Sequence, residues 1–178
     1  VEGLAQVETD IGHGFVDSAG RQIIAPYYES VGDFSGGLAA VRTNGKWGYI
    51  DVAGNMIITP EYDWAESFST GVAKVIVAKK WGMIDTSGKA LILPEYDDVV
   101  PSASGIYKVI KDNKYGYFDK TGQVIVRPDC DSIEDFVNGR AWIKRYGRWG
   151  LVTSTGISKI AAQCTDKFEF PNGQIWIK

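Results

Sequence analysis

A period of 34 residues runs through this 178-residue chain without an insertion or a deletion, and it limits the possible folds more than any other feature. Glycines and prolines mark the period at fixed phases. The clearest series are Gly14, Gly48, Gly82, Gly116 and Gly150, and Pro26, Pro60, Pro94 and Pro128. Such a period predicts copies of one supersecondary unit, which stack so that each copy buries its apolar face against its neighbours.

The unit is predicted to consist of β-strands rather than of a helix pair. Each copy contains three or four glycines and a proline, which would interrupt two helices of the length that this period allows. Short runs rich in aromatic and β-branched residues lie between them and are typical of strands.

The second copy shows where the strands are expected. It predicts strands at 38–42, 47–51 and 56–59, with Asn44-Gly45 as a hairpin signal between the first two. We expect Pro60 to end the third strand, because proline has no N–H to donate to a ladder. Residues 61–70 should then form a connecting loop.

The fold class follows from these units. We predict an all-β chain of tandem 34-residue repeats, with about three antiparallel strands each, that forms a single repeat domain over 1–178. Six copies of the first strand accompany five copies of the rest, which favours an open, solenoid-like array. The alternative is a closed ring resembling a five-bladed β-propeller. The predicted units are a partial one at 1–11, then 12–45, 46–79, 80–113, 114–147 and 148–178.

Alternation along the first strand of each unit predicts which side chains are buried. The phase of Ala39 and Val41 is apolar in every copy and is expected to face the core. The intervening phase varies, and we expect it to face solvent or a partner. Its members are Gln6, Ala40, Lys74, Lys108, Trp142 and Trp176.

Composition argues against several classes of partner. Acidic residues outnumber basic residues by 22 to 19, for a net charge of −3, whereas a general nucleic-acid binder is usually basic. The longest uncharged stretches are too short to span a bilayer. We therefore expect neither a nucleic-acid partner nor a membrane span. Cys130 and Cys164 do not make a disulfide framework and are expected to be buried free thiols.

The units resemble the WG repeat, also called the KWG repeat, of many bacterial proteins. The resemblance rests on Lys46-Trp47-Gly48-Tyr49-Ile50-Asp51 and its equivalents, which begin at Lys80, Lys114 and Arg148, and on Pro60-Glu61-Tyr62-Asp63 and Pro94-Glu95-Tyr96-Asp97. It implies a β-rich repeat module that is often appended to other domains. It implies no general biochemical activity and carries no catalytic residues to this chain.

Two rows of carboxylates are the clearest candidates for metal ligands. The first row is Asp17, Asp51, Asp85 and Asp119, and the second is Glu29, Asp63, Asp97 and Asp131. Carboxylates at a fixed spacing can bind calcium in stacked β-structures. However, an aspartate that opens a turn bonds its own backbone, so we expect a turn role and no metal.

No catalytic motif accompanies these acids. The chain shows no Ser-His-Asp set, phosphate-binding loop or dinucleotide fingerprint, and its single histidine, His13, has no identifiable catalytic partner. We therefore expect no enzyme activity and no cofactor.

Tryptophans that depart from the repeat are the best candidates for binding. Trp142 and Trp176 occupy the phase that is expected to face outward, and Arg140 and Lys144 lie beside Trp142. Trp64 stands where other copies carry serine or aspartate. Because exposed tryptophan is typical of binding hot spots, we predict a module that binds a protein partner or acts as a scaffold. The alternative is a glycan or cell-wall binder that stacks sugars on the rings.

Overall fold

The computed structural model describes residues 2–102, 105–169 and 174–178, and these residues form β-strands and turns without an α-helix. None of the described segments forms a helix with the length and hydropathy that a membrane crossing requires. Contacts group the chain into two compact units, Val1–Glu95 and Tyr96–Lys178. The expectation of a single repeat domain over 1–178 stays a prediction.

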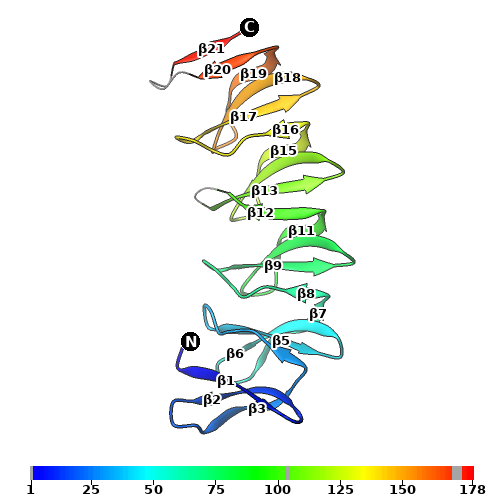
Figure 1. Cartoon of the computed structure of the whole chain (residues 1–178), viewed down its shortest axis with the longest axis vertical. Coiled ribbons are helices and arrows are strands. Elements are labelled where there is room, and N and C mark those ends of the chain that lie inside the picture. Colours follow the sequence, from blue (N-terminus) through cyan, green and yellow to red (C-terminus); the bar gives the residue numbers. More distant parts are fainter. Residues whose placement is uncertain (1, 103–104, 170–173) are drawn as a thin grey trace. The chain divides into compact units, whose positions relative to one another are not determined.

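The first compact unit contains three antiparallel sheets that follow one another along the chain (Figure 1). The first sheet has three strands, and the next two have four each, the last of which ends at the boundary between the units. The strands are β1 (Leu4–Thr9), β2 (Gly12–Asp17) and β3 (Gln22–Tyr28); β4 (Ser30–Val31), β5 (Leu38–Thr43), β6 (Lys46–Asp51) and β7 (Met56–Tyr62); and β8 (Trp64–Ala65), β9 (Val72–Val77), β10 (Lys80–Asp85) and β11 (Ala90–Tyr96).

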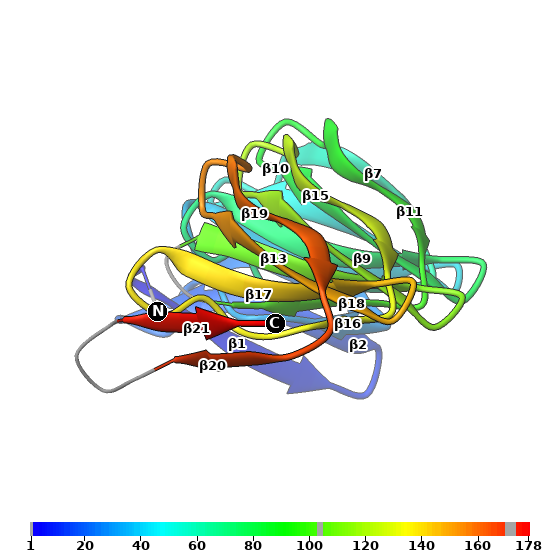
Figure 2. The same ribbon diagram turned by 90° about the horizontal axis from the view of Figure 1, so that it is seen from above.

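The second compact unit repeats this arrangement with two four-stranded sheets and a two-stranded one. Seen from above in Figure 2, β17 overlies β13, the equivalent strand of the preceding sheet. The strands are β12 (Asp98–Pro101), β13 (Ile106–Lys111), β14 (Lys114–Asp119) and β15 (Val124–Cys130); β16 (Ser132–Ile133), β17 (Arg140–Arg145), β18 (Arg148–Thr153) and β19 (Ser158–Cys164); and β20 (Lys167–Glu169) and β21 (Ile175–Ile177).

The repeats form an open array. A closed ring would place the first and last copies of the first strand in one sheet. Instead, β1 pairs with β2, whereas β21 pairs with β20 in a sheet of its own. The predicted all-β array of tandem repeats is therefore confirmed, and the propeller-like alternative is not adopted.

A short fourth strand lies in each segment that was expected to be only a loop. In the second repeat, Trp64 of β8 pairs with Ile76 and Ala65 pairs with Val75. The backbone N–H groups of Asp63 and Glu66 extend this ladder by donating to carbonyls of β9. A two-residue strand is too short for side-chain alternation to reveal, so sequence patterns do not predict it.

The third strand continues past the proline that recurs in each repeat, which corrects the prediction that Pro60 ends it. Strand β7 runs to Tyr62, which pairs with Trp47, whereas Ile58 pairs with Tyr49. The register therefore shifts between these pairs, at a bulge that contains Pro60. A bulged residue does not donate to the ladder, so the missing proline N–H costs nothing there.

The motif glycine and this proline form the two sides of one close contact. A Cβ on Gly48 would lie 2.4 Å from the Ile58 carbonyl oxygen and 2.7 Å from the Pro60 nitrogen. Gly14, Gly82, Gly116 and Gly150 face the same bulge, with nearest backbone atoms at 2.4, 2.7, 2.7 and 2.8 Å. The φ angle of Gly48 is not positive. This position therefore requires glycine for space rather than for backbone freedom.

Within each compact unit, the apolar core lies between successive sheets. Ala39 and Val41 of β5 pack with Phe15 of the first sheet, whereas Ala40 faces the other way and packs in a cluster with Val75 of β9. The middle sheet is therefore covered on both faces. Both cysteines are buried and free, as predicted.

The expectation that the intervening phase of the first strand faces outward is wrong inside the array. Ala40 is 2% exposed and Trp142 is 5% exposed, because the next sheet along the chain covers the sheet face on which each of them lies. Gln6 is exposed, as expected, and so is Trp176 (49%), since no described sheet follows β20 and β21.

The glycine contact predicts a specific loss of stability. We expect Gly82→Ala to lower the free energy of unfolding by about 1–3 kcal/mol, because the new methyl group meets backbone that cannot move aside. Gly32→Ala is the control, because its Cβ would meet only ordinary contacts at 3.4 Å and beyond, at a φ that is not positive. Urea unfolding measures both variants, and equal effects would contradict the steric explanation.

The hairpin turns predict a gain of stability. Asn44 and Gly45 have φ angles of 50° and 74°, whereas Ala78 and Lys79 hold φ angles of 49° and 65° in the equivalent turn. Glycine adopts such angles freely and asparagine tolerates them, whereas other residues with a Cβ are destabilised by roughly 1 kcal/mol. We expect the Ala78→Asn, Lys79→Gly double variant to raise the free energy of unfolding by about 1 kcal/mol. An unchanged or lower midpoint in urea would contradict this.

Candidate functional site

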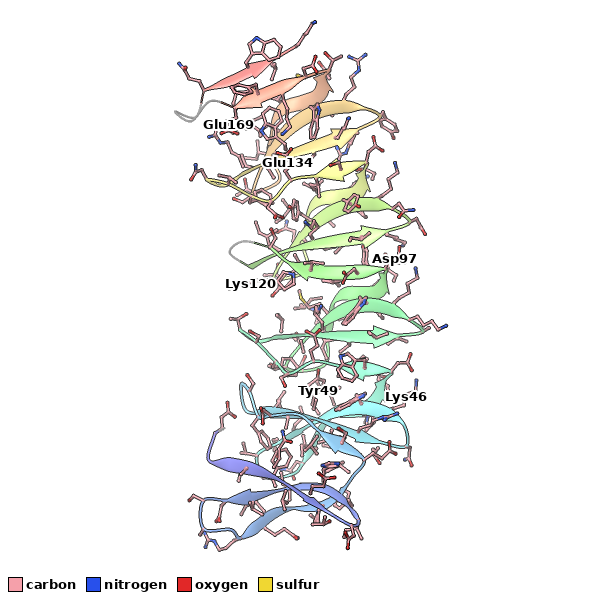
Figure 3. All side chains as sticks on the ribbon, viewed as in Figure 1. Lys46, Tyr49, Asp97, Lys120, Glu134 and Glu169 are labelled. Carbon is pink, nitrogen blue, oxygen red and sulfur yellow. The ribbon has the colours of Figure 1, made fainter. Side chains whose placement is uncertain are left out.

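The structure places Trp142 under the last described sheet rather than on a surface. Its indole Nε1 donates to Oε2 of Glu169 at 3.3 Å, and the Lys167 ammonium lies 5.0 Å from the ring centroid. Glu169 also accepts from Arg140, at 3.4 Å (Figure 3 labels Glu169). A buried indole N–H needs such a partner, so β20 supplies what Trp142 requires.

The other predicted residues are only partly brought together. Lys144 lies on the same strand as Trp142, and its ammonium group is 5.3 Å from the ring centroid of Trp149 on the neighbouring strand. Trp176 pairs across β20 and β21 with Phe168, and both rings are about half exposed. The structure therefore divides the predicted Trp142 face into a buried cluster and a separate exposed strand.

Trp64 is half exposed, and it borders a cavity in the first compact unit. Its ring is 46% exposed and contacts Trp47 edge to face, with centroids 5.3 Å apart. The cavity has a volume of about 430 Å³ and opens between the sheet of β4–β7 and the sheet of β8–β11. We call it the Trp64 groove. Its walls are Ser30, Val31, Gly32, Ala40, Trp47, Trp64, Ala65, Glu66 and Ser67.

The Trp64 groove exists because two small residues replace larger ones. One repeat later, Lys74 and Glu66 occupy the positions of Ala40 and Gly32, and their charged groups pair at 3.3 Å. Further along the chain, the Ala40 position is filled by Lys108, which pairs with Asp135, and by Trp142, which bonds Glu169.

The sequence pattern singles out Trp64 but gives no sign of the groove beneath it. Alternation along the first strand favours Trp142 and Trp176 instead, because it predicts that their phase faces outward. The usable signal was the pairing of Gly32 with Ala40, since these small residues occupy positions where other repeats carry large side chains.

Tyr49 holds the backbone on one side of the groove. Its hydroxyl donates to the Glu66 carbonyl at 2.7 Å, and its ring packs on Phe68 with centroids 4.7 Å apart. Burial raises the pKa of the Tyr49 hydroxyl, so it stays protonated and keeps donating. Figure 3 labels Tyr49 and Lys46, which both reach from one sheet towards the next.

The first acidic row closes turns, as predicted. Oδ1 of Asp51 accepts from the backbone N–H groups of Ala53 at 2.9 Å and Asn55 at 2.8 Å. The Asn55 side-chain amide is the main donor that holds the pKa of Asp51 below its ordinary value, and the Ser87 hydroxyl does the same for Asp85. Asp17, Asp85 and Asp119 make the equivalent contacts, and each accepts from the backbone N–H groups two and four residues further along the chain.

The second acidic row caps the hairpins and ties sheets together. Oδ2 of Asp63 accepts from the Ala78 N–H at 2.7 Å, and its other oxygen pairs with Lys46 of the preceding sheet. The Lys46 ammonium holds the pKa of Asp63 low. Equivalent hairpin contacts are Glu29 with Gly45, Asp97 with Asp112, and Asp131 with Gly147. Asp131 also pairs with Lys114 of the preceding sheet, as Asp63 does with Lys46.

These carboxylates are therefore engaged with the backbone and with lysines. Within residues 2–102, 105–169 and 174–178, no three His, Cys, Asp or Glu side chains are grouped so that they could hold a metal ion.

The residues that fix this geometry are those of one repeat family. A family model described as "WG containing repeat" matches residues 14–47, 47–81, 81–115 and 115–149, which is most of the chain. This chain belongs to the WG repeat family. The Trp64 groove is thus a local departure from the pattern of WG repeats, since Gly32 and Ala40 replace residues that are larger in the other copies.

Comparisons with other proteins add little to this. No curated protein matches the WG-repeat chain. Among solved structures, it is similar to a eukaryotic initiation factor, with 11% identity and a TM-score of 0.45 over 98% of this chain and 57% of that one. It is also similar to the extracellular domain of the putative hybrid two-component system BT3049 from B. thetaiotaomicron, with 12% identity and a TM-score of 0.38 over 98% of this chain and 30% of that one.

The WG-repeat chain thus spans less than two thirds of the length of both structures. At TM-scores below 0.5, these likenesses support no inference about function.

Acid is expected to destabilise the chain through its turns. The pKa values of Asp51 and Asp85 are lower in the folded chain than the ordinary value, which is about 3.9 in an unfolded chain. Their carboxylates therefore stabilise the fold above that pH and lose this contribution as pH falls through the folded pKa. We expect the Asp51→Asn, Asp85→Asn double variant to lose less stability than wild type below about pH 4.

Urea unfolding followed by circular dichroism, at neutral pH and at intervals down to about pH 2, measures this difference. Parallel stability curves for the two proteins would contradict the assignment of acid sensitivity to these turns.

Proposed function

We propose that this chain is a non-catalytic binding module, and that a protein partner inserts an apolar side chain into the Trp64 groove. The observation that carries the proposal is the half-exposed Trp64 ring at the edge of a cavity of about 430 Å³. Tryptophan is enriched among interface residues that dominate binding energy. A ring held against a second tryptophan also loses little freedom on binding.

The chemistry of the groove favours an apolar anchor. Two indole rings and the side chains of Val31, Ala40 and Ala65 form most of its walls. The one charged wall residue, Glu66, already pairs with Lys74. Apolar surface with few unpaired charges is typical of the centre of a protein interface.

Glycan binding is the second candidate. Ser30 and Ser67 bring two hydroxyl groups to the groove beside Trp64, and sugars can stack on an indole face while hydroxyl groups bond their rims. Its test is a glycan array probed with the variants described below.

The protein-binding proposal is tested by selecting peptides that bind the chain and then measuring their affinity for a variant whose groove is filled. Peptides displayed as a random library are selected on the wild-type chain, and their affinities are measured by fluorescence polarisation. The Gly32→Glu, Ala40→Lys double variant imports the ion pair that Glu66 and Lys74 form one repeat later. It therefore closes the groove with residues that this fold already accepts.

We expect selected peptides to carry an aromatic or large aliphatic anchor. Trp64→Ser and the groove-filling double variant should each weaken binding about tenfold or more, as loss of a hot spot does. Trp176→Ser is the matched control, because it removes a tryptophan of similar exposure that borders no part of the groove. It should leave affinity unchanged.

Two results would contradict the proposal. One is peptide binding that survives both Trp64→Ser and the groove-filling variant. The other is saturable binding to a glycan that depends on Trp64, with no peptide enriched, which would establish the second candidate instead.

A further inference from the structure

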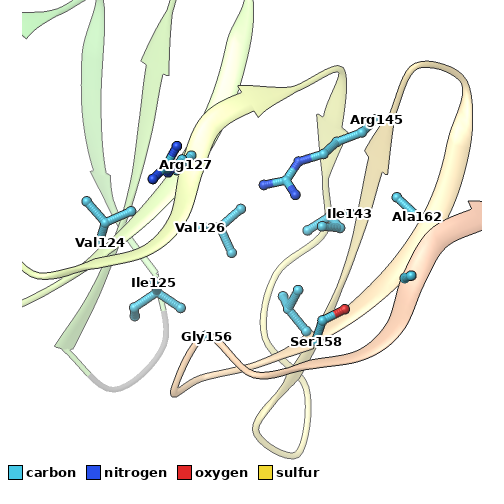
Figure 4. Close-up of a pocket in the computed structure, with 11 residues that line it drawn as sticks. Val124, Ile125, Val126, Arg127, Ile143, Arg145, Gly156, Ser158 and Ala162 are labelled. Atoms are coloured by element: carbon cyan, nitrogen blue, oxygen red, sulfur yellow. The ribbon is translucent and has the colours of Figure 1, made fainter.

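A second cavity lies in the second compact unit, between the sheet of β12–β15 and the sheet of β16–β19 (Figure 4). Its volume is about 540 Å³, which falls within the range of small-molecule sites. At one end the turn at Gly156 closes it, because a Cβ there would lie 3.0 Å from the Ile125 carbonyl oxygen. Elsewhere the two sheets leave a space between them.

Small residues on β19 leave this space open. Ala161 and Ala162 line the cavity, and the same two positions are Arg127 and Pro128 one repeat earlier. The strand that should close the gap therefore has only methyl groups to fill it.

The inner wall of the cavity is apolar. It consists of Val126, Ile143 and Val152, which are 3%, 3% and 5% exposed and belong to the core between the two sheets. Such a wall suits a hydrocarbon group rather than a hydrated ion.

The rim of the cavity is cationic. Arg127 and Arg145 both line it, and Figure 4 shows the Arg145 guanidinium extending across the cavity towards the strand that carries Arg127. Arg145 donates through Nε to Asp129 at 2.7 Å and also interacts with the Cys130 side chain. A guanidinium group carries five N–H donors, so these two contacts leave donors for another acceptor. The Arg127 carbonyl accepts from the Cys130 thiol, but its guanidinium group has no hydrogen-bond or ion-pair partner within the described part of the chain.

The charges on this rim do not balance. Asp129 offsets one of the two guanidinium groups, so a net positive charge lies at the rim of the cavity in a chain whose overall charge is −3. Two guanidinium groups near low-dielectric surface repel each other, and an anion between them would relieve the repulsion.

We propose that this cavity binds a small organic carboxylate. The carboxylate bonds the guanidinium groups of Arg127 and Arg145, and its hydrocarbon part lies against Val126, Ile143 and Val152. Planar carboxylates match the fork of N–H groups on arginine. The site is independent of the Trp64 groove and uses none of its residues.

Titration of the ¹⁵N-labelled chain with octanoate tests the proposal, with octanol as the neutral probe of equal chain length. N-acetylleucine distinguishes a carboxylate at the end of a peptide from a free fatty acid. We expect saturable amide shifts on β15, β17 and β19 with a carboxylate probe, and binding of octanol at least about tenfold weaker.

Three variants separate charge, shape and general electrostatics. Arg127→Gln should weaken octanoate binding about tenfold by removing a charged donor. Ala161→Leu should weaken it similarly, because the larger side chain takes up space at a position that lines the cavity. Lys159 lies on β19 but does not line the cavity. Lys159→Gln therefore removes a positive charge nearby and should leave the affinity for octanoate unchanged.

Three results would overturn the proposal. They are octanol binding as tight as octanoate binding, equal losses in Arg127→Gln and Lys159→Gln, and the absence of saturable shifts at these strands with millimolar carboxylate. Spectra of each variant without ligand show whether it is folded, so loss of binding is not confused with loss of structure.

Discussion

The close contact between each motif glycine and the bulge on the third strand is the constraint on which the rest of the structure depends. Gly48 lets the backbone of β7 pass within 2.4 Å of where a Cβ would be, and the bulge accommodates Pro60 without a missing ladder bond. The strand can therefore continue to Tyr62, from which the chain enters the next short strand at Trp64. Glycine and proline recur at a fixed spacing because they form one contact.

Burial on both faces explains what the sequence predicts and what it does not. The period, the three long strands, the Asn44-Gly45 hairpin and the turn role of Asp51 follow from local chemistry, and all are found. The burial of Trp142 does not follow, because alternation of apolar and polar residues identifies a buried face only when the opposite face of the strand is exposed to solvent. Lys74 appears solvent-facing in the sequence, yet it lies between sheets, where it pairs with Glu66 and lies 4.3 Å from the centroid of the Trp81 ring.

Both cavities arise where a repeat loses side chains that its neighbours keep. Gly32 and Ala40 open the Trp64 groove, and Ala161 and Ala162 open the arginine-rimmed cavity. A regular stack offers little concave surface, because each sheet fills the face of the next. Sites in such a chain are therefore expected at small residues that depart from the repeat rather than at the large residues that maintain it.

The solvent exposure of individual tryptophans tests this account most directly. Fluorine NMR of the chain labelled with 5-fluorotryptophan resolves its six tryptophans, and single Trp→Phe variants assign Trp64 and Trp142. The account predicts that the Trp64 resonance shifts between H₂O and D₂O and responds to a bound partner peptide, whereas the Trp142 resonance does neither. A Trp142 resonance that responds to solvent and peptide while Trp64 stays silent would contradict it.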